Sequence, residues 1–227
     1  MNTVIRFLAV ACIALSTHRA HAAFGYINYS FSSGSTLFTS QLDSPPNNLT
    51  TLFSGATIPD GTTISLWDPA TLGFNLGSTF SSGAWSFNLT LQAGQGYRLN
   101  TSAAFINTFV GTILNHDGSV LTGSLTPPPV YAGPNGIYLL ADKSPLADTG
   151  IDIFLNILGR QPNAGEQVIT LSSTSTYLGG GNWSGGVPTL NVGDAALLNI
   201  GPVPEPSTVA LGLLGIVLSY FCRRRRL

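Results

Sequence analysis

The long middle part of this sequence, residues 24–203, contains no cysteine. The two cysteines of the 227-residue chain, Cys12 and Cys222, both fall in apolar terminal segments. A disulfide framework is therefore excluded for the middle part, and so is a cysteine thiolate as nucleophile or metal ligand. We expect its fold to rest on apolar burial and backbone hydrogen bonds alone.

Charge is also scarce, because charged residues make up only 8% of the chain. Residues 24–203 carry three basic residues, Arg98, Lys143 and Arg160, against nine acidic ones, so their formal charge is 3 − 9 = −6. Nucleic-acid binding requires clustered cations that contact phosphates. We therefore expect no nucleic acid among the partners.

Motifs for catalysis are missing from the same region. It has no Gly-x-Ser-x-Gly elbow, no pair of histidines for zinc and no phosphate-binding Gly-x4-Gly-Lys loop. Its single histidine, His116, lies in Asn-His-Asp-Gly, residue types that are typical of a turn. Glycan hydrolysis needs two carboxylates, and nothing in the sequence places Glu166, the one glutamate here, beside an aspartate. We expect no catalytic residue.

Two aspartates, Asp148 and Asp152, could share a calcium ion through their oxygens, but the spaced acids of a known calcium loop are absent. Asp152 fits better in the first turn of a short helix, where a negative charge meets the positive end of the helix dipole. We therefore expect neither a metal site nor a cofactor.

The N-terminal residues 1–22 have the pattern of a secretory signal peptide. Arg6 supplies an early cation, residues 7–15 form an apolar core, and Ala20-His21-Ala22 is an A-x-A cleavage site. We expect signal peptidase to recognise Ala20 and Ala22 and to cut after Ala22. A lipoprotein signal at Cys12 is the alternative, although the five apolar residues before that cysteine are too few for a normal core.

The C-terminal residues have the pattern of a stop-transfer segment. An apolar stretch, residues 208–222, is followed at once by Arg223, Arg224, Arg225 and Arg226. Positive residues stay on the cytoplasmic side, which places everything before residue 203 outside. The stretch is shorter than the about 20 helical residues that cross a bilayer, but arginine side chains can extend to the interface. We therefore expect a marginal transmembrane helix.

A proline-rich motif, Val203-Pro204-Glu205-Pro206-Ser207, stands directly before this stretch. Together the motif, the span and the arginines of residues 203–227 resemble the PEP-CTERM sorting signal of Gram-negative bacteria, a tail also labelled an ice-binding-protein C-terminal domain. The resemblance implies that a membrane-embedded exosortase recognises the motif, cuts near residues 204–206 and releases the body to the cell surface or the surrounding matrix. A simpler alternative is that the two prolines only end the last strand.

The pattern of residues 24–203 indicates an all-β fold, with mostly antiparallel sheets that have one face in water. The clearest predicted strand is 85–92, in which Trp85, Phe87, Leu89 and Leu91 alternate with polar residues. Clusters of proline, glycine, asparagine and aspartate separate it from the other strands. Further strands are predicted at 62–67, 97–100, 105–114, 137–141, 167–172 and 195–200.

The sequence also predicts an internal repeat. The helix-like pattern of Leu49, Leu52 and Phe53 recurs 102 positions later as Ile151, Phe154 and Leu155. Three further matches have similar offsets: Ile64 and Leu66 with Ile169 and Leu171 at 105, Trp85 with Trp183 at 98, and residues 93–100 with 192–199 at 99. We therefore expect two tandem β-rich repeats, residues 23–111 and 112–202, each with one short helix.

These features favour a non-enzymatic surface or matrix protein that is delivered by its tail and interacts with extracellular polysaccharide or with other copies of itself. Trp85 and Trp183 hold matching repeat positions and are expected in the core. Trp67, followed by Asp68 and Pro69, is the candidate for an exposed ligand contact. The alternatives are a carbohydrate-binding module and, third, a glycan-active enzyme. Ice binding needs regular threonine arrays, and the threonines here are scattered.

Overall fold

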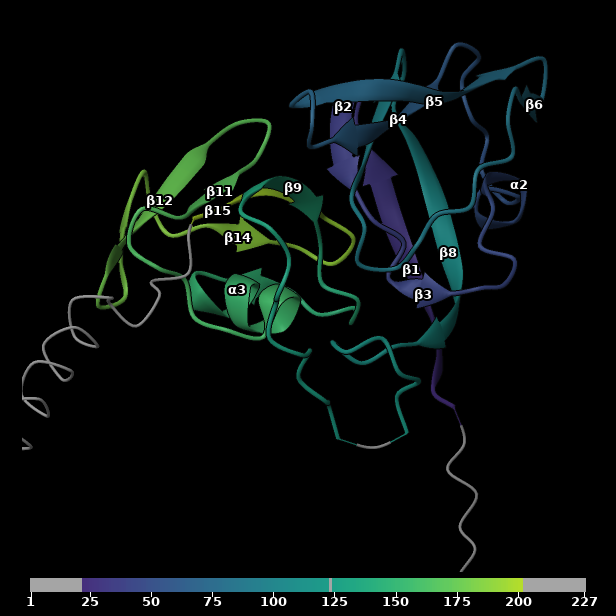
Figure 1. The fold of residues 1–227 in the computed structure, drawn as a ribbon. Helices are drawn as coiled ribbons and strands as arrows, with labels where there is room; N and C mark the ends of the chain where they lie inside the picture. The colour runs from purple at the N-terminus through teal and green to yellow at the C-terminus, as the bar shows by residue number, and fades with distance from the viewer. Residues whose placement is uncertain (1–21, 123, 202–227) are drawn as a thin grey trace, which may run out of the picture.

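The computed structural model describes residues 22–122 and 124–201 (Figure 1). Several predicted features lie outside the described residues: the signal peptide up to residue 21 with Ala20, the motif 203–207, the apolar stretch 208–222 and the arginines 223–226. Ala22 is the first described residue and is exposed, two positions before the first strand. Among the helices that the structure does describe, none has the length and apolar composition of a membrane span.

The described residues form antiparallel sheets with two short helices, so the predicted all-β class is confirmed. The first half of the body contributes β1 (Phe24–Phe31), β2 (Gly34–Phe38), β3 (Leu42–Asp43), α2 (Leu49–Leu52), β4 (Thr63–Asp68), β5 (Gly73–Ser81), β6 (Ala84–Trp85), β7 (Tyr97–Thr101) and β8 (Phe105–Ile113). The second half contributes β9 (Gly136–Leu140), β10 (Asp148–Thr149), α3 (Ile151–Leu158), β11 (Gln167–Ile169), β12 (Thr174–Gly179), β13 (Asn182–Ser184), β14 (Thr189–Leu190) and β15 (Ala196–Ile200). Figure 1 shows the first half on the right and the second on the left.

Each half contains a five-stranded antiparallel sheet, and the two sheets have the same strand order. The order is β2-β7-β4-β5-β6 in the first half and β9-β15-β11-β12-β13 in the second. The registers agree as well: Gly34 pairs with Thr101, and Gly136, 102 positions after Gly34, pairs with Ile200, 99 positions after Thr101. This agreement in order and register is what an internal repeat predicts.

The structure corrects one of the repeat matches by one residue. In β4 the buried Ile64 pairs with Leu99, and in β11 the buried Val168 pairs with Leu198, the equivalent of Leu99. Ile64 therefore corresponds to Val168, 104 positions later, and its predicted match with Ile169 is wrong. Because side chains alternate between the two faces of a strand, a shift of one residue exchanges inside and outside.

Both predicted short helices are present. Asn48 caps α2, because its side-chain oxygen accepts a hydrogen bond from the backbone N–H of Thr51 at 2.9 Å. The second helix buries an apolar face made of Ile153, Phe154 and Leu158. Asp152 lies in the first turn of α3, where the helix dipole favours a negative charge.

The predicted strand 85–92 is wrong, since only Ala84–Trp85 (β6) pairs in the sheet. The N–H of Ser86 still donates to the carbonyl of Thr79 at 2.8 Å, but the next residue is bound by a side chain and not by the backbone of a neighbouring strand. The hydroxyl of Ser78 donates to the carbonyl of Phe87 at 2.7 Å and accepts from the N–H of Phe87 at 3.1 Å. Beyond this point Leu91 is buried while Phe87 is 67% exposed, so the alternating apolar residues do not share one inward face.

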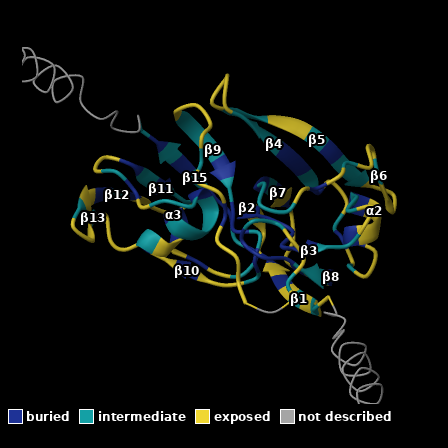
Figure 2. Cartoon of the chain, turned by 60° about the horizontal axis from the view of Figure 1, so that its bottom comes forward, coloured by how far each residue is buried: buried dark blue, intermediate teal, exposed yellow. Residues whose placement is uncertain are grey.

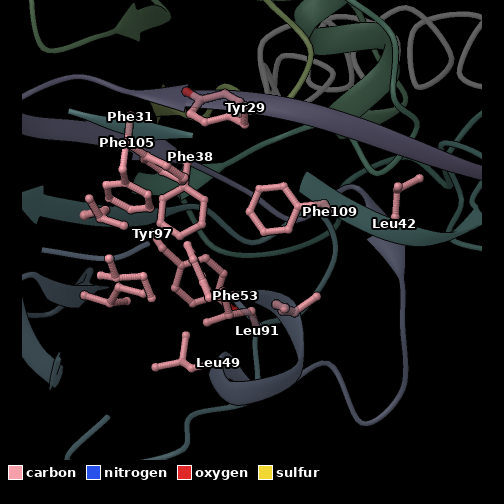
Figure 3. Close-up of a cluster of buried hydrophobic side chains, with 14 residues drawn as sticks. Tyr29, Phe31, Phe38, Leu42, Leu49, Phe53, Leu91, Tyr97, Phe105 and Phe109 are labelled. Carbon is pink, nitrogen blue, oxygen red and sulfur yellow. The ribbon is translucent and has the colours of Figure 1, made fainter. Parts of the chain in front are cut away.

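Each half has its own core. That of the first half is a cluster of aromatic and aliphatic side chains, which includes members from β1, β3 and β8 of the three-stranded sheet β1-β8-β3 (Figure 3). Phe53 lies in this cluster, with ring centroids 5.6–6.2 Å from those of Phe31, Phe38, Trp85 and Phe109. The core of the second half is smaller and is formed mainly by α3, β11 and β15.

Trp85 and Trp183 pack on these cores, as their predicted structural role requires. Each half-buried indole lies against two aromatic rings of its own half. The contacts are Trp85 with Phe53 and Phe80, and Trp183 with Phe154 and Tyr177, at centroid distances of 5.1–6.3 Å.

Candidate functional site

The two halves meet at the ends of β2 and β9. Phe38, at the end of β2, forms an antiparallel bridge with Asp194 of the second half, and Leu140, at the end of β9, forms one with Gln95 of the first half. The contacts are reciprocal, because Leu140 stands 102 positions after Phe38 and Asp194 stands 99 positions after Gln95. The junction therefore has pseudo-two-fold symmetry, in which each half offers the same two segments.

Four backbone hydrogen bonds cross the junction in two matching pairs. The N–H groups of Thr39 and Ala141 donate to the carbonyls of Gly193 and Gly94 at 2.9 and 3.0 Å, and those of Ala195 and Gly96 donate to Leu37 and Leu139 at 3.4 and 3.1 Å. Leu37 and Leu139 also belong to one apolar cluster that spans both halves. Buried residues, dark blue in Figure 2, gather where β2 and β9 approach each other, so the junction is part of the interior.

The buried side chain of Gln41 adds a polar tie across the junction. Its amide group donates to the carbonyls of Ser144 at 2.8 Å and Asp142 at 3.2 Å, and its oxygen accepts from the N–H of Gly193 at 2.7 Å. Buried polar groups need such partners. One side chain of the first half thus holds two separate segments of the second.

A groove opens beside the junction at the position of Trp67. This Trp67 groove has a volume of about 370 Å³ and is lined by Trp67, Pro69, Gln92, Gln95, Tyr138 and Leu140, with smaller residues between them. None of its lining residues carries a charge. The side chains come from both halves, so the groove exists only because the halves are joined.

Trp67 itself is half-buried, which departs from the exposed position that the sequence suggests. Its indole N–H donates to the carbonyl of Ile137 in β9 at 2.7 Å, and its ring meets that of Phe74 edge-on at 5.1 Å. The indole therefore ties β4 to the second half while part of it lines the groove. A ligand would meet an aromatic ring that is already held in position.

A second groove lies beside the junction at Tyr29. This Tyr29 groove has a volume of about 400 Å³, and hydroxyl and amide groups dominate its lining. Its main members are Tyr29, Thr36, Leu171, Ser172, Asn191 and Asp194. Asp194 is the one charged residue among them, so the groove is polar and carries no cation. It was not predicted from the sequence.

The carboxylate of Asp194 is held firmly in the Tyr29 groove. One oxygen accepts from the phenol of Tyr29 at 2.7 Å, and the other accepts from the backbone N–H and the side-chain amide of Asn191 at 2.9 and 3.0 Å. Burial, and secondly the neighbouring carboxylate, raises the pKa of Tyr29 far above its usual range. Tyr29 therefore stays a neutral hydrogen-bond donor.

His116 lies in the predicted turn, but its side chain is buried and paired. Its Nδ1 is 2.8 Å from both carboxylate oxygens of Asp142, and Asp142 also accepts from the N–H of Ser144. Burial raises the pKa of Asp142. Within the described residues no serine, threonine or cysteine side chain is hydrogen-bonded to His116, so the pair has no nucleophile to activate.

Asp148, which was considered as a calcium ligand together with Asp152, is buried and is held by one neighbour. The side-chain amide of Asn156 donates to its Oδ1 at 2.6 Å, and burial raises the pKa of Asp148 to about 6. Asp152, by contrast, is exposed on α3. No group of three or more histidine, cysteine, aspartate or glutamate side chains with the geometry of a metal site occurs in residues 22–122 and 124–201.

Replacing Asp148 with asparagine is expected to stabilise the protein above pH 6 by about 1 to 2 kcal/mol. A raised carboxyl pKa means that the fold prefers the neutral acid, so this stability is complete below about pH 4 and is lost as the pH rises through 6. The full shift corresponds to about 3 kcal/mol, and solvent screening reduces it. Asparagine stays neutral and can still accept from Asn156. Urea unfolding at pH 4, 6 and 8 measures the difference.

The matched control for this change is Asp152→Asn, which alters an exposed carboxylate four residues away, on α3. It should change the unfolding free energy by less than about 0.5 kcal/mol at each of the three pH values, and it should not stabilise the protein above pH 6. A pH profile of the Asp148→Asn variant that follows that of the unmodified protein would contradict the assignment.

Glu166, the candidate acid for glycan hydrolysis, is fully engaged in structure. It is 1% exposed, and both of its oxygens accept from the guanidinium of Arg160, at 2.7 and 2.9 Å. The backbone N–H groups of Asn163 and Gly201 donate to the same carboxylate at 2.8 and 3.0 Å. A carboxylate whose acceptor positions are filled in this way has no position left for a substrate oxygen.

Residues 202–226 match the family model of the PEP-CTERM protein-sorting motif. The match spans the proline-rich motif, the apolar stretch and the arginines, and it confirms the sorting signal predicted from the sequence. Such a signal marks an exported protein that an exosortase processes. No curated protein and no solved structure shows significant similarity to the chain.

Proposed function

We propose that this chain, which carries a PEP-CTERM sorting signal, is an exported surface or matrix protein without enzymatic activity, and that its β-sheet body associates with extracellular polysaccharide. Signal peptidase and an exosortase process its two ends. The membrane holds the chain through residues 208–222 until the tail is cut.

The residues at which the folded body begins and ends support this processing. The backbone of Ala23 donates to Leu121 at 3.2 Å and accepts from Ile113 at 2.8 Å, whereas Ala22 is exposed. At the other end the N–H of Gly201 donates to Glu166. Cuts after Ala22 and near residues 204–206 would therefore leave these terminal hydrogen bonds of the body in place.

The absence of enzymatic activity is supported by the structural roles of Glu166 and His116, the two side chains considered for catalysis. Glu166 is bound by Arg160 and two backbone N–H groups, and His116 is paired with a buried aspartate. Four hydrogen bonds fill the acceptor positions of Glu166, and among the described residues no nucleophilic side chain is hydrogen-bonded to His116, as acyl transfer would require.

Association with polysaccharide is supported chiefly by the Trp67 groove. Sugars offer apolar ring faces and neutral hydroxyl groups, and this groove offers an indole, a tyrosine and amide side chains without any charge. The body's shortage of cations disfavours a polyanionic partner. The groove and the outward destination of the chain together favour a neutral polymer outside the cell.

The full chain, purified in a zwitterionic detergent that contains no sugar, is expected to be retarded in gels that contain soluble neutral polysaccharides. Trp67→Phe should weaken this binding about tenfold, because one good aromatic contact contributes on the order of 1 kcal/mol. Phenylalanine keeps the packing on Phe74, but it shortens the surface that faces the groove and removes the indole N–H that binds Ile137, so its unfolding curve is measured as well.

Trp85→Phe is the matched control, since it makes the same change in a half-buried indole outside both grooves. The proposal fails if no polymer retards the chain or if the two variants lose binding equally. Tight binding of a single sugar class, lost with Trp67, would favour a carbohydrate-binding module over a structural role. Products released from any polymer would show an enzyme.

A further inference from the structure

The Tyr29 groove and the Trp67 groove occupy equivalent positions of the pseudo-two-fold junction. Leu171 stands 104 positions after Trp67, the offset of β4 and β11, and Asn191 stands 99 positions after Gln92. Thr36 of the Tyr29 groove corresponds to Tyr138 of the Trp67 groove at an offset of 102. Each groove thus forms between two segments. One is the turn before the last strand of one five-stranded sheet, and the other is the first strand of the other five-stranded sheet.

The two grooves keep the same layout but differ in chemistry. Trp67 and Tyr138 give one groove an aromatic surface, whereas Leu171 and Thr36 give the other a smaller apolar contact among hydroxyl groups. Leu171 is 55% exposed, which leaves its side chain free to touch a ligand. A flat saccharide ring could rest on this leucine, and its hydroxyl groups would find polar partners at the rim.

The polar groups of the Tyr29 groove are fixed before any ligand arrives. Asp194 is held by Tyr29 and Asn191, as described above. The turn that carries Leu171 is held by the hydroxyl of Thr170, which accepts from the N–H groups of Ser172 and Ser173 at 3.3 and 3.0 Å. Groups that are already ordered lose little entropy on binding, so this groove is suited to recognition.

We propose that the Tyr29 groove is a second polysaccharide-binding site, equivalent by junction symmetry to the Trp67 groove, and that the body is therefore bivalent. The proposal rests on the proposed function, because it assigns the same class of ligand to both grooves. The ligand class is a neutral polysaccharide, whose hydroxyl groups donate to Asp194 and whose ring faces contact Leu171. An anionic polymer is disfavoured, because the groove carries one carboxylate and no cation.

Bivalency predicts a property that a single groove cannot give. A body with two sites can bind two segments of one polymer, which raises its avidity, or two different polymer chains, which links them. Linking polymers is a structural role outside the cell. It also requires both grooves at once, so binding and linking can be separated by variants.

The test compares binding and linking for the full chain in the same sugar-free detergent. Binding is measured by retardation in gels with soluble β-glucan, xylan, galactomannan or dextran, and linking by light scattering of the same polymers. Leu171→Ala and Asp194→Asn alter the Tyr29 groove, and Trp67→Phe alters the Trp67 groove. Leu178→Ala is the control, because Leu178 is exposed on β12 outside both grooves.

We expect each groove variant to weaken binding about tenfold and to abolish the rise in scattering, while the combination of Leu171→Ala with Trp67→Phe removes binding. A Leu171→Ala variant that binds and links like Leu178→Ala would overturn the second site. If only Trp67→Phe loses binding, the proposed function stands and the second site falls. If the unmodified chain binds no neutral polymer, both fall together. Unfolding curves for Leu171→Ala that match those of Leu178→Ala show that a loss is local.

Discussion

Replacing Glu166 with alanine is expected to lower the free energy of unfolding by about 3 to 5 kcal/mol. The substitution leaves the guanidinium of Arg160, 13% exposed, without its carboxylate, and it removes the acceptor of the N–H groups of Asn163 and Gly201. An uncompensated buried charge is the main cause of such losses. The Glu166 carboxylate also joins the segment after α3 to the end of the body, through the N–H of Gly201, so its loss should loosen the C-terminal edge of the second half.

Urea unfolding of the full chain measures this effect, and Asp152→Ala is the control. Asp152 is an exposed acid of the same half with no buried partner charge, so its removal should change the unfolding free energy by less than about 0.5 kcal/mol. If Glu166→Ala unfolds like this control, the carboxylate is not the buried anchor described here. Loss of turnover on a polymer at unchanged stability would instead restore Glu166 as a catalytic acid.

Replacing Phe53 with alanine should cost a similar amount, about 3 to 5 kcal/mol. Phe53 is 2% exposed and contacts four aromatic rings in the core of the first half (Figure 3). Alanine would leave a cavity among rigid rings that cannot collapse to fill it. Because the body contains no cysteine, no disulfide limits the loss.

Phe87→Ala is the matched control for Phe53, since it removes the same ring from a position that is 67% exposed. Its expected effect on the unfolding free energy is within about 0.5 kcal/mol. A regular strand at residues 85–92 would bury Phe87. The comparison of the two variants therefore also distinguishes the described structure from that predicted strand. A large loss for Phe87→Ala, with little for Phe53→Ala, would contradict the described core.

The strands with a clean local pattern were predictable from the sequence. In β7, Tyr97, Leu99 and Thr101 are buried and alternate with the polar Arg98 and Asn100, and a strand was expected at 97–100. The strand β1 was not predicted, because aromatic residues stand on both of its faces: Tyr29 and Phe31 are buried, whereas Phe24 and Tyr26 are exposed. Alternation identifies a strand only when one face is polar.

The predicted strand 85–92 failed for a different reason. Its apolar residues alternate as a strand requires, but a side chain elsewhere in the sheet, the hydroxyl of Ser78, binds the backbone of Phe87 and ends the ladder. A hydrogen bond between positions nine residues apart leaves no periodic signal in the sequence.

The candidate site was only partly predictable. Trp67 could be chosen from its neighbours in the sequence, but its partner Ile137 lies 70 positions away. Tyr29 and Asp194 are 165 positions apart, and neither residue belongs to a motif. The repeat offsets of 102 and 99 showed which positions of the two halves are equivalent. They do not show that the two halves contact each other at these positions. That contact depends on the packing of both halves.

The proposed function requires that two removable ends deliver a folded body, free of cysteine, to the outside of the cell. The most direct test is the intact mass of the protein recovered from outside the producing cell. We expect a species that begins at Ala23 and ends near residues 204–206, with the apolar stretch and the arginines removed. A recovered mass that retains residues 208–227, or a full-length chain found soluble in the cytosol, would show that the chain is not delivered in this way.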